Sequence, residues 1–93
     1  MDIKNLDKLL MAELIKARQK FPWWPDDIVH AVAILQEECG ELVKACLDFY
    51  YERGTLLEVT KELAHTGAML YRFGLHLEEY EQKTQIENKE DGE

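Results

Sequence analysis

Glutamates at helical spacing are the side chains of this sequence best suited to chemistry. Glu37, Glu38 and Glu41 lie within the stretch LQEECGELVKA, residues 35–45. Glu38 and Glu41 are one helical turn apart, so both carboxylates can reach the same point in space. Carboxylates gathered closely repel and raise each other's pKa, a conflict that a divalent cation removes. The spacing therefore predicts half of a metal site.

A second set of polar residues can supply the other half. Glu58, Glu62 and His65 recur at i, i+4 and i+7, and Glu62 falls closest to the apolar positions of its helix. Inward-facing acids on paired helices hold metals in helical bundles. The opposing interpretation is a solvated face, because glutamate is a good helix former and most helical glutamates face water.

Three features favour a site over a solvated face. The acids border apolar residues instead of forming a far polar face, and the same ExxE and ExxH arrangement recurs on two helices. Gly40 lies between the acids, where a mid-helix glycine costs about 1 kcal/mol relative to alanine. The close approach of another group to the helix would explain this glycine.

Helices are expected to position these residues. Apolar positions three and four residues apart predict a first helix from about Ile3 to Lys20. The segment FPWWPDD then interrupts, because its two prolines cannot continue a helix, and Asp26 is the expected N-cap of the next one. That second helix is expected over residues 27–52, ended by Gly54 as the C′ residue. Its predicted buried stripe is Ile28, Val32, Leu35, Cys39, Leu42, Cys46 and Phe49.

A third helix is predicted from a capping box of Thr55 and Glu58 to about Gly74. No segment has the two-residue period of a strand, so the fold is predicted to be all-α, a helical bundle built on two long antiparallel helices. We expect one domain over residues 1–77, and an acidic helix end and disordered tail over residues 78–93. So small a chain buries a limited fraction of its surface, so completion as a homodimer or homotetramer is expected.

Composition excludes several classes of protein. The net charge of −8 is concentrated in residues 78–93, where seven acids and two lysines give −5. Without a basic stripe, the chain is a poor candidate for binding nucleic acid. No run approaches the roughly 18 apolar residues that span a bilayer, and the charged N-terminus does not read as a signal peptide. Cys39 and Cys46 lie too far apart to bridge, which is typical of a reduced, cytoplasmic protein.

The stretch EECGEL, with a second acidic helix after it and the tryptophan–proline segment before it, resembles the all-α nucleoside triphosphate pyrophosphohydrolases of the MazG-like superfamily. The likeness covers about residues 20–75 and is closest to small single-domain members from phages and mobile elements. It implies Mg²⁺-dependent cleavage of a (d)NTP between its α- and β-phosphates, with Mn²⁺ as a possible substitute. The products would be the monophosphate and pyrophosphate, and the family suggests a role in cleaning nucleotide pools.

The resemblance also implies roles for individual residues. By position, Glu37, Glu38 and Glu41 fill the family's EExxE motif, and Glu62 fills the first position of ExxD. We expect Glu38, Glu41 and Glu62 to bind metal, and Glu37 to be a ligand or the catalytic base. His65 stands where the family has aspartate. Imidazole is a poor ligand for Mg²⁺ but suits Mn²⁺ or Zn²⁺, so His65 could bind a softer metal, contact a phosphate, or do neither.

Five further residues are candidates for substrate contact. Trp23 could stack on a nucleobase, although we favour a tryptophan plug that packs the first helix on the second. His30 shares a helix face with the acids and could equally be structural. Lys61 and Arg72, with Lys44, could contact phosphate, but an ion pair with a glutamate is the simpler interpretation of each. The rival functions are a non-catalytic helical interaction protein and a nucleotide sensor that does not cleave.

Overall fold

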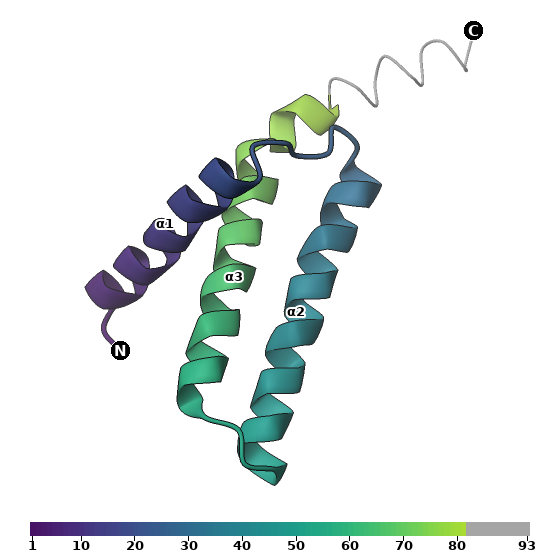
Figure 1. Cartoon of the computed structure of the whole chain (residues 1–93). Helices are drawn as coiled ribbons and strands as arrows, with labels where there is room; N and C mark the ends of the chain where they lie inside the picture. The colour runs from purple at the N-terminus through teal and green to yellow at the C-terminus, as the bar shows by residue number, and fades with distance from the viewer. Residues whose placement is uncertain (82–93) are drawn as a thin grey trace, which may run out of the picture.

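The computed structural model describes residues 1–81, and within them the secondary structure is helical without a strand. The order is α1 (Ile3–Lys20), α2 (Ile28–Tyr51) and α3 (Leu56–Leu75) (Figure 1), followed by a helical turn over residues 77–81. The all-α prediction is therefore confirmed. In this part of the chain no helix is both long and apolar enough to cross a membrane. The tail predicted beyond residue 81 lies outside the described residues.

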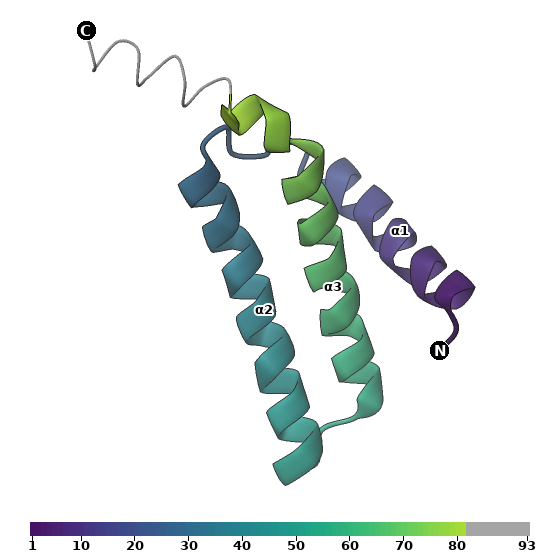
Figure 2. The same cartoon turned by 180° about the vertical axis from the view of Figure 1, so that it is seen from behind.

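α3 is the central helix. α2 lies beside α3 and runs in the opposite direction, and a short loop joins the end of α2 to the start of α3. α1 packs on the other side of α3 (Figures 1 and 2). Because α3 separates α1 from α2, a plug of tryptophans that packs the first helix on the second is not what the chain forms. Any site shared by all three helices must be organised around α3.

Side chains cap each helix at its N-terminus. The Asp2 carboxylate accepts the N–H of Asn5 at 2.8 Å, and Thr55 Oγ1 accepts the N–H of Glu58 at 3.2 Å, as the predicted capping box requires. The N-cap of α2 is Asp27, not Asp26 as predicted, and it accepts the N–H of His30 at 2.9 Å. The cap lies one residue further along because the helix begins at residue 28.

The loop between α2 and α3 depends on Gly54. Its N–H donates to the carbonyl of Asp48 at 3.1 Å. A Cβ at this position would lie 2.9 Å from backbone atoms of Asp48 and Phe49. No described residue has a positive φ, so this glycine allows close approach of the chain to the end of α2, not a left-handed turn.

Few large side chains are buried in the described part of the chain. The buried apolar residues there are Leu14, Pro25, Ala31, Ala45, Ala64, Ala68 and Tyr80, and no large side chain is fully buried. None of the predicted stripe of α2 is fully buried: Leu35, Cys39 and Leu42 are partly covered, and Ile28, Val32, Cys46 and Phe49 are exposed. That stripe therefore lies at one edge of the packed face. Glu38 comes midway between Ala31 and Ala45 in sequence, so it lies on the face turned toward α3.

Gly67 sets the distance between α1 and α3. It is buried, and a Cβ there would lie 2.4 Å from Leu10 Cδ2. We expect Gly67→Ala to lower the free energy of unfolding by about 1–3 kcal/mol, because the methyl group overpacks this contact. Urea denaturation measures the effect. Gly74→Ala is the matched control, since Gly74 lies on the same helix with nothing within 4 Å; equal effects of the two variants would contradict the assignment.

Candidate metal centre

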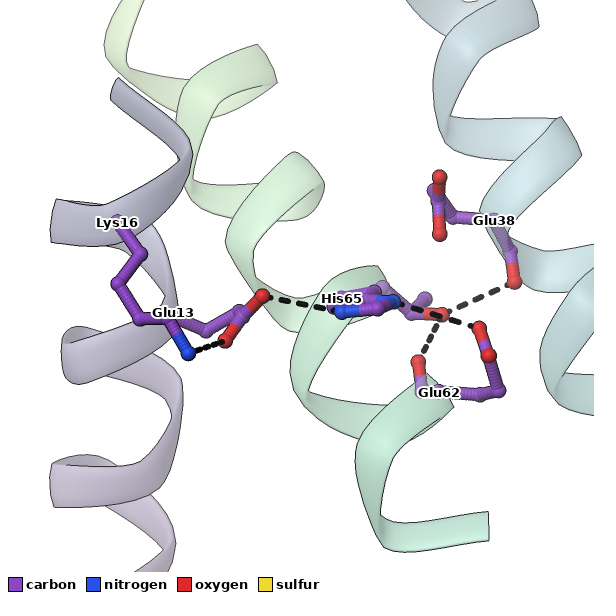
Figure 3. Close-up of polar contacts among 6 residues, drawn as sticks. Glu13, Lys16, Glu38, Glu62 and His65 are labelled. Atoms are coloured by element: carbon purple, nitrogen blue, oxygen red, sulfur yellow. Dashed lines mark hydrogen bonds and ion pairs between the residues drawn. The ribbon is translucent and has the colours of Figure 1, made fainter. Parts of the chain in front are cut away.

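α2 and α3 bring three possible metal ligands together. Glu38 comes from α2, and Glu62 and His65 come from α3. One ligand atom from each lies within 4.8 Å of the others, and all three residues are partly buried. Figure 3 shows the imidazole of His65 between the helices, with its Nδ1 3.5 Å from Glu62 Oε2. Two carboxylates and one imidazole are a donor set that fits a divalent cation, and the nitrogen suits Mn²⁺ or Zn²⁺ better than Mg²⁺.

The environment of Glu38 opposes its charge. Burial raises the pKa of this carboxyl, His65 lowers it, and the carboxylates of Glu62, Glu41 and Glu37 raise it further. The net shift is upward from the usual value. A bound cation would offset the cost of burying the charged carboxylate and counter its repulsion from the neighbouring acids.

A threonine hydroxyl joins the two helices at the centre. The single hydroxyl hydrogen of Thr66 is shared between two carbonyls, that of Glu62 at 2.8 Å within α3 and that of Glu38 at 3.1 Å on α2. The sequence analysis missed this role. The sequence feature that could have revealed this role is a polar residue at a position where the apolar pattern of α3 predicts a hydrophobic one.

We expect Thr66→Val to destabilise the protein by about 1 kcal/mol, because the isosteric change removes the hydrogen bond between the helices. Thr60→Val is the control, since Thr60 Oγ1 donates to the carbonyl of Leu56 at 2.9 Å within α3 and makes no described bond to α2. Thermal denaturation of both variants compares the two effects. A loss no greater for Thr66→Val than for Thr60→Val would show that the interhelical bond adds nothing.

α1 adds a residue that the sequence analysis did not predict. Glu13 Oε1 lies 3.0 Å from Nε2 of His65, and Glu13 Oε2 lies 3.7 Å from Nζ of Lys16 (Figure 3). Glu13 follows Leu10 by three residues and precedes the buried Leu14. Helical periodicity therefore turns it toward α3, which is the signal that could have found it.

The predicted ligand Glu41 is not in the three-residue group. It is exposed and faces a separate hollow of about 150 Å³. The other residues around this hollow are Lys44, Ala45, Asp48, Gly54, Glu58 and Glu62. Residue spacing along α2 could not predict where Glu41 points. The position of α3 decides which acids of α2 lie next to α3.

A larger cavity of about 810 Å³ opens beside His65. Its acids are Glu13, Glu37 and Glu38, so the exposed Glu37 lies beside the metal centre without belonging to the three-residue group. Three lysines and three aromatic residues also line it: Lys16, Lys20, Lys61, Phe21, Trp23 and Trp24. The cavity thus combines cationic and aromatic side chains with carboxylates and an imidazole. Of the substrate candidates from the sequence, Trp23, Lys61 and Arg72 line it.

Arg72 also lines this cavity, but its hydrogen bonds go to the backbone of other residues in the cavity wall. It is buried, and its Nη2 donates to the carbonyls of Phe21 at 2.8 Å and Trp23 at 3.1 Å. Its guanidinium lies 4.9 Å from the ring centroid of Trp24. Burial lowers the pKa of Arg72, with a further contribution from Arg18. Arg72 therefore bonds to the backbone and packs on Trp24 within the protein. These contacts take the place of the phosphate contact predicted from the sequence.

The two tryptophans have different surroundings. Trp24 is half-buried, donates its Nε1–H to the hydroxyl of Tyr80 at 2.6 Å and stacks on His76. Because Tyr80 is buried in this contact, the packed body extends past residue 77. Trp23 is exposed at the cavity and its ring lies 5.6 Å from that of His30. His30 does not line the cavity, so its predicted substrate contact finds no support there.

The fold and the site together define the kind of protein that the described residues form. It is an all-α protein with a candidate carboxylate–imidazole centre beside a basic and aromatic cavity. A scan against protein-family models, a search of curated proteins and a search of solved structures each found no match.

Proposed function

We propose that this protein is a divalent-metal-dependent nucleoside triphosphate pyrophosphohydrolase, converting a (d)NTP and water to a (d)NMP and pyrophosphate. The observation that carries the proposal is the group of Glu38, Glu62 and His65 at the edge of a cavity lined by lysines and aromatic rings. The resemblance of EECGEL to the MazG-like superfamily supports the same reaction. Under this proposal Mg²⁺ or Mn²⁺ is the cofactor.

The cavity suits a nucleotide in size and in chemistry. Its volume of about 810 Å³ lies within the roughly 300–1,000 Å³ typical of small-molecule sites. Trp23 presents an exposed ring on which a base can stack. Lys16, Lys20 and Lys61 supply positive charge for phosphates. We assign Trp23 to the base and the lysines to the phosphate chain.

The reaction needs charge stabilisation and an oriented water. The cation, when bound, supplies positive charge to the phosphates. We propose that Glu38, Glu62 and His65 hold it, and that Glu37 accepts the proton of the attacking water, because Glu37 lines the cavity outside the ligand group. Water oxygen bonds to the α-phosphorus while the bond from that phosphorus to the α–β bridging oxygen breaks. Pyrophosphate leaves with that oxygen.

The direct test incubates the purified protein with a panel of canonical and modified dNTPs and Mg²⁺ or Mn²⁺. Pyrophosphate and monophosphate in equal amounts are expected with at least one member of the panel. Nucleotide binding without products would assign a sensor instead. If the folded protein binds neither metal nor nucleotide, the pyrophosphohydrolase proposal is overturned. The non-catalytic helical interaction protein then remains as the explanation.

The outer face of α2 supports a second proposal, a homodimer. Opposite the face turned to α3, apolar residues near both ends of the helix remain exposed: Val29 73%, Val32 46%, Val43 56%, Leu47 50% and Tyr50 77%. A helix that is apolar on two faces is typically buried on both. We propose that the α2 helix of a second copy covers this face, and two such dimers would give the tetramer.

Gly40 lies within the same exposed face. Nothing comes within 4 Å of the position its Cβ would occupy, so the close approach expected from the sequence is not made within the chain. A second α2 crossing here would make that approach, since glycine lets two helix backbones come together. The small core of the single chain, without a fully buried large side chain among the described residues, agrees with a fold completed by a partner.

A further inference from the structure

The imidazole of His65 lies between carboxylates from two different helices. Its Nε2 is 3.0 Å from Glu13 Oε1 on α1, and its Nδ1 is 3.5 Å from Glu62 Oε2 on α3 (Figure 3). Both contacts are ion pairs between an imidazole nitrogen and a carboxylate oxygen, and the one with Glu13 is the shorter. Because the closer carboxylate faces Nε2, we assign the ring hydrogen to Nε2. Nδ1 is then the nitrogen left facing the carboxylates of the metal centre.

We infer that Glu13 is a positioning residue for the metal centre: it accepts the Nε2–H of His65 and so presents the Nδ1 lone pair to a transition-metal ion shared with Glu38 and Glu62. The inference rests on the metal centre of the proposed function. Metal-binding histidines commonly donate their other ring N–H to a carboxylate, which fixes the ring and strengthens it as a ligand. Glu13 has the position and the chemistry of that carboxylate.

Glu13 is held ready for this role by its own helix. Its second oxygen, Oε2, pairs with Lys16 one turn further along α1. Its side chain is only 21% exposed, and α1 is seated on α3 by the close contact of Leu10 with Gly67. The orientation of His65 therefore depends on the docking of a helix that contributes no ligand.

The consequence is selectivity among metal ions. Imidazole suits Mn²⁺ and Zn²⁺, whereas Mg²⁺ prefers oxygen ligands and keeps several waters. A carboxylate that orients His65 therefore strengthens binding of Mn²⁺ and leaves binding of Mg²⁺, held by the two glutamates, little changed. The centre is expected to prefer Mn²⁺ to Mg²⁺, and Glu13 is expected to account for part of this preference.

Calorimetric titration of the full chain with Mn²⁺ and, separately, with Mg²⁺ tests the inference. Glu13→Ala is expected to weaken Mn²⁺ binding by about 10–100-fold, as loss of an orienting carboxylate typically does. The affinity for Mg²⁺ should change far less. Glu13→Gln retains an oxygen that can accept the Nε2–H, so its loss should be smaller than that of alanine. Asp7→Asn removes an exposed acid of α1 away from the centre and should change neither affinity.

The possible results distinguish a failure of this inference from a failure of the proposed function on which it rests. Mn²⁺ binding that is unchanged in Glu13→Ala overturns the inference and leaves the metal centre standing. Equal losses for alanine and glutamine, with both ions, show that Glu13 contributes only charge and also overturn it. No Mn²⁺ binding by the folded wild type overturns both. Glu13-dependent selectivity without hydrolysis of any nucleotide supports the inference and overturns the pyrophosphohydrolase. Thermal denaturation of each variant verifies that it is folded.

Discussion

Replacing Glu38 by glutamine is expected to reduce metal-dependent hydrolysis sharply while making the metal-free protein more stable at neutral pH. The variant loses one of three ligands, and hydrolysis should fall on the order of 10²–10³-fold, the effect of removing one charge-stabilising group from an active site. It also removes a carboxylate whose charge is disfavoured first by burial and then by neighbouring acids. Removal of this charge should raise the free energy of unfolding by about 0.5 kcal/mol.

The gain in stability has a definite dependence on pH. The pKa of Glu38 in the folded protein is raised above 4.5, so between the two values the folded state holds more protons than the unfolded state. The stability of the wild type therefore falls as pH rises through this interval. The advantage of the variant should be absent below the unfolded pKa and complete above the folded one.

Urea denaturation with a chelator at pH 4 and pH 7, together with a pyrophosphate assay, measures both effects. Glu52→Gln is the control, because it removes an exposed acid at the end of α2 away from the cavity. Retained hydrolysis in Glu38→Gln would show that the metal centre is misplaced. A loss of stability at pH 7 would contradict the electrostatic account of this carboxyl.

Leu47→Glu is expected to convert the protein from a dimer to a monomer. Leu47 is half exposed on the outer face of α2, where the proposed second copy packs. A two-fold interface would bury the new carboxylate twice, and each unpaired buried charge is strongly unfavourable. The dissociation constant should rise by at least about 100-fold, which corresponds to about 2.8 kcal/mol. Light scattering should then give the mass of a single chain, 10.9 kDa, where the wild type gives twice that value.

Two further variants make this test specific. Met11→Glu introduces the same charge at an exposed apolar residue of α1 and should leave the dimer intact. Gly40→Ala should weaken the dimer, although alanine is the better helix former within a single chain. A wild type that is monomeric at micromolar concentration would overturn the dimer, and dissociation by Met11→Glu would place the interface elsewhere.

The sequence was sufficient to predict the helices and part of the centre, because both depend on local rules. Turn chemistry around Thr55 and periodicity along the chain act within a few residues. They correctly predicted the all-α fold and the capping of α3. The spacing of Glu62 and His65 likewise placed both on one flank of a helix, where the structure finds them together with Glu38.

What the sequence analysis missed depends on contacts between helices. α2 is apolar on two faces, so its periodicity could not show which one meets α3. The alanines at residues 31 and 45 mark that face, because closely packed helices accommodate small side chains. Glu41 was expected beside Glu38, yet the position of α3 leaves it outside the group. Glu13 was not predicted because spacing along one helix carries no information about a different helix.

The lack of a fully buried large side chain in the described part of the chain has a mechanical consequence. Large side chains on facing helices interlock and oppose sliding of one helix along the other, and partly covered ones oppose it less. The register of α2 against α3 therefore depends on the tight loop at Gly54 and on the Thr66 hydroxyl. A slip of one turn would move Glu38 about 5.4 Å from Glu62, which is enough to separate the ligands. Alignment of the centre thus depends on two small residues that bind no metal themselves.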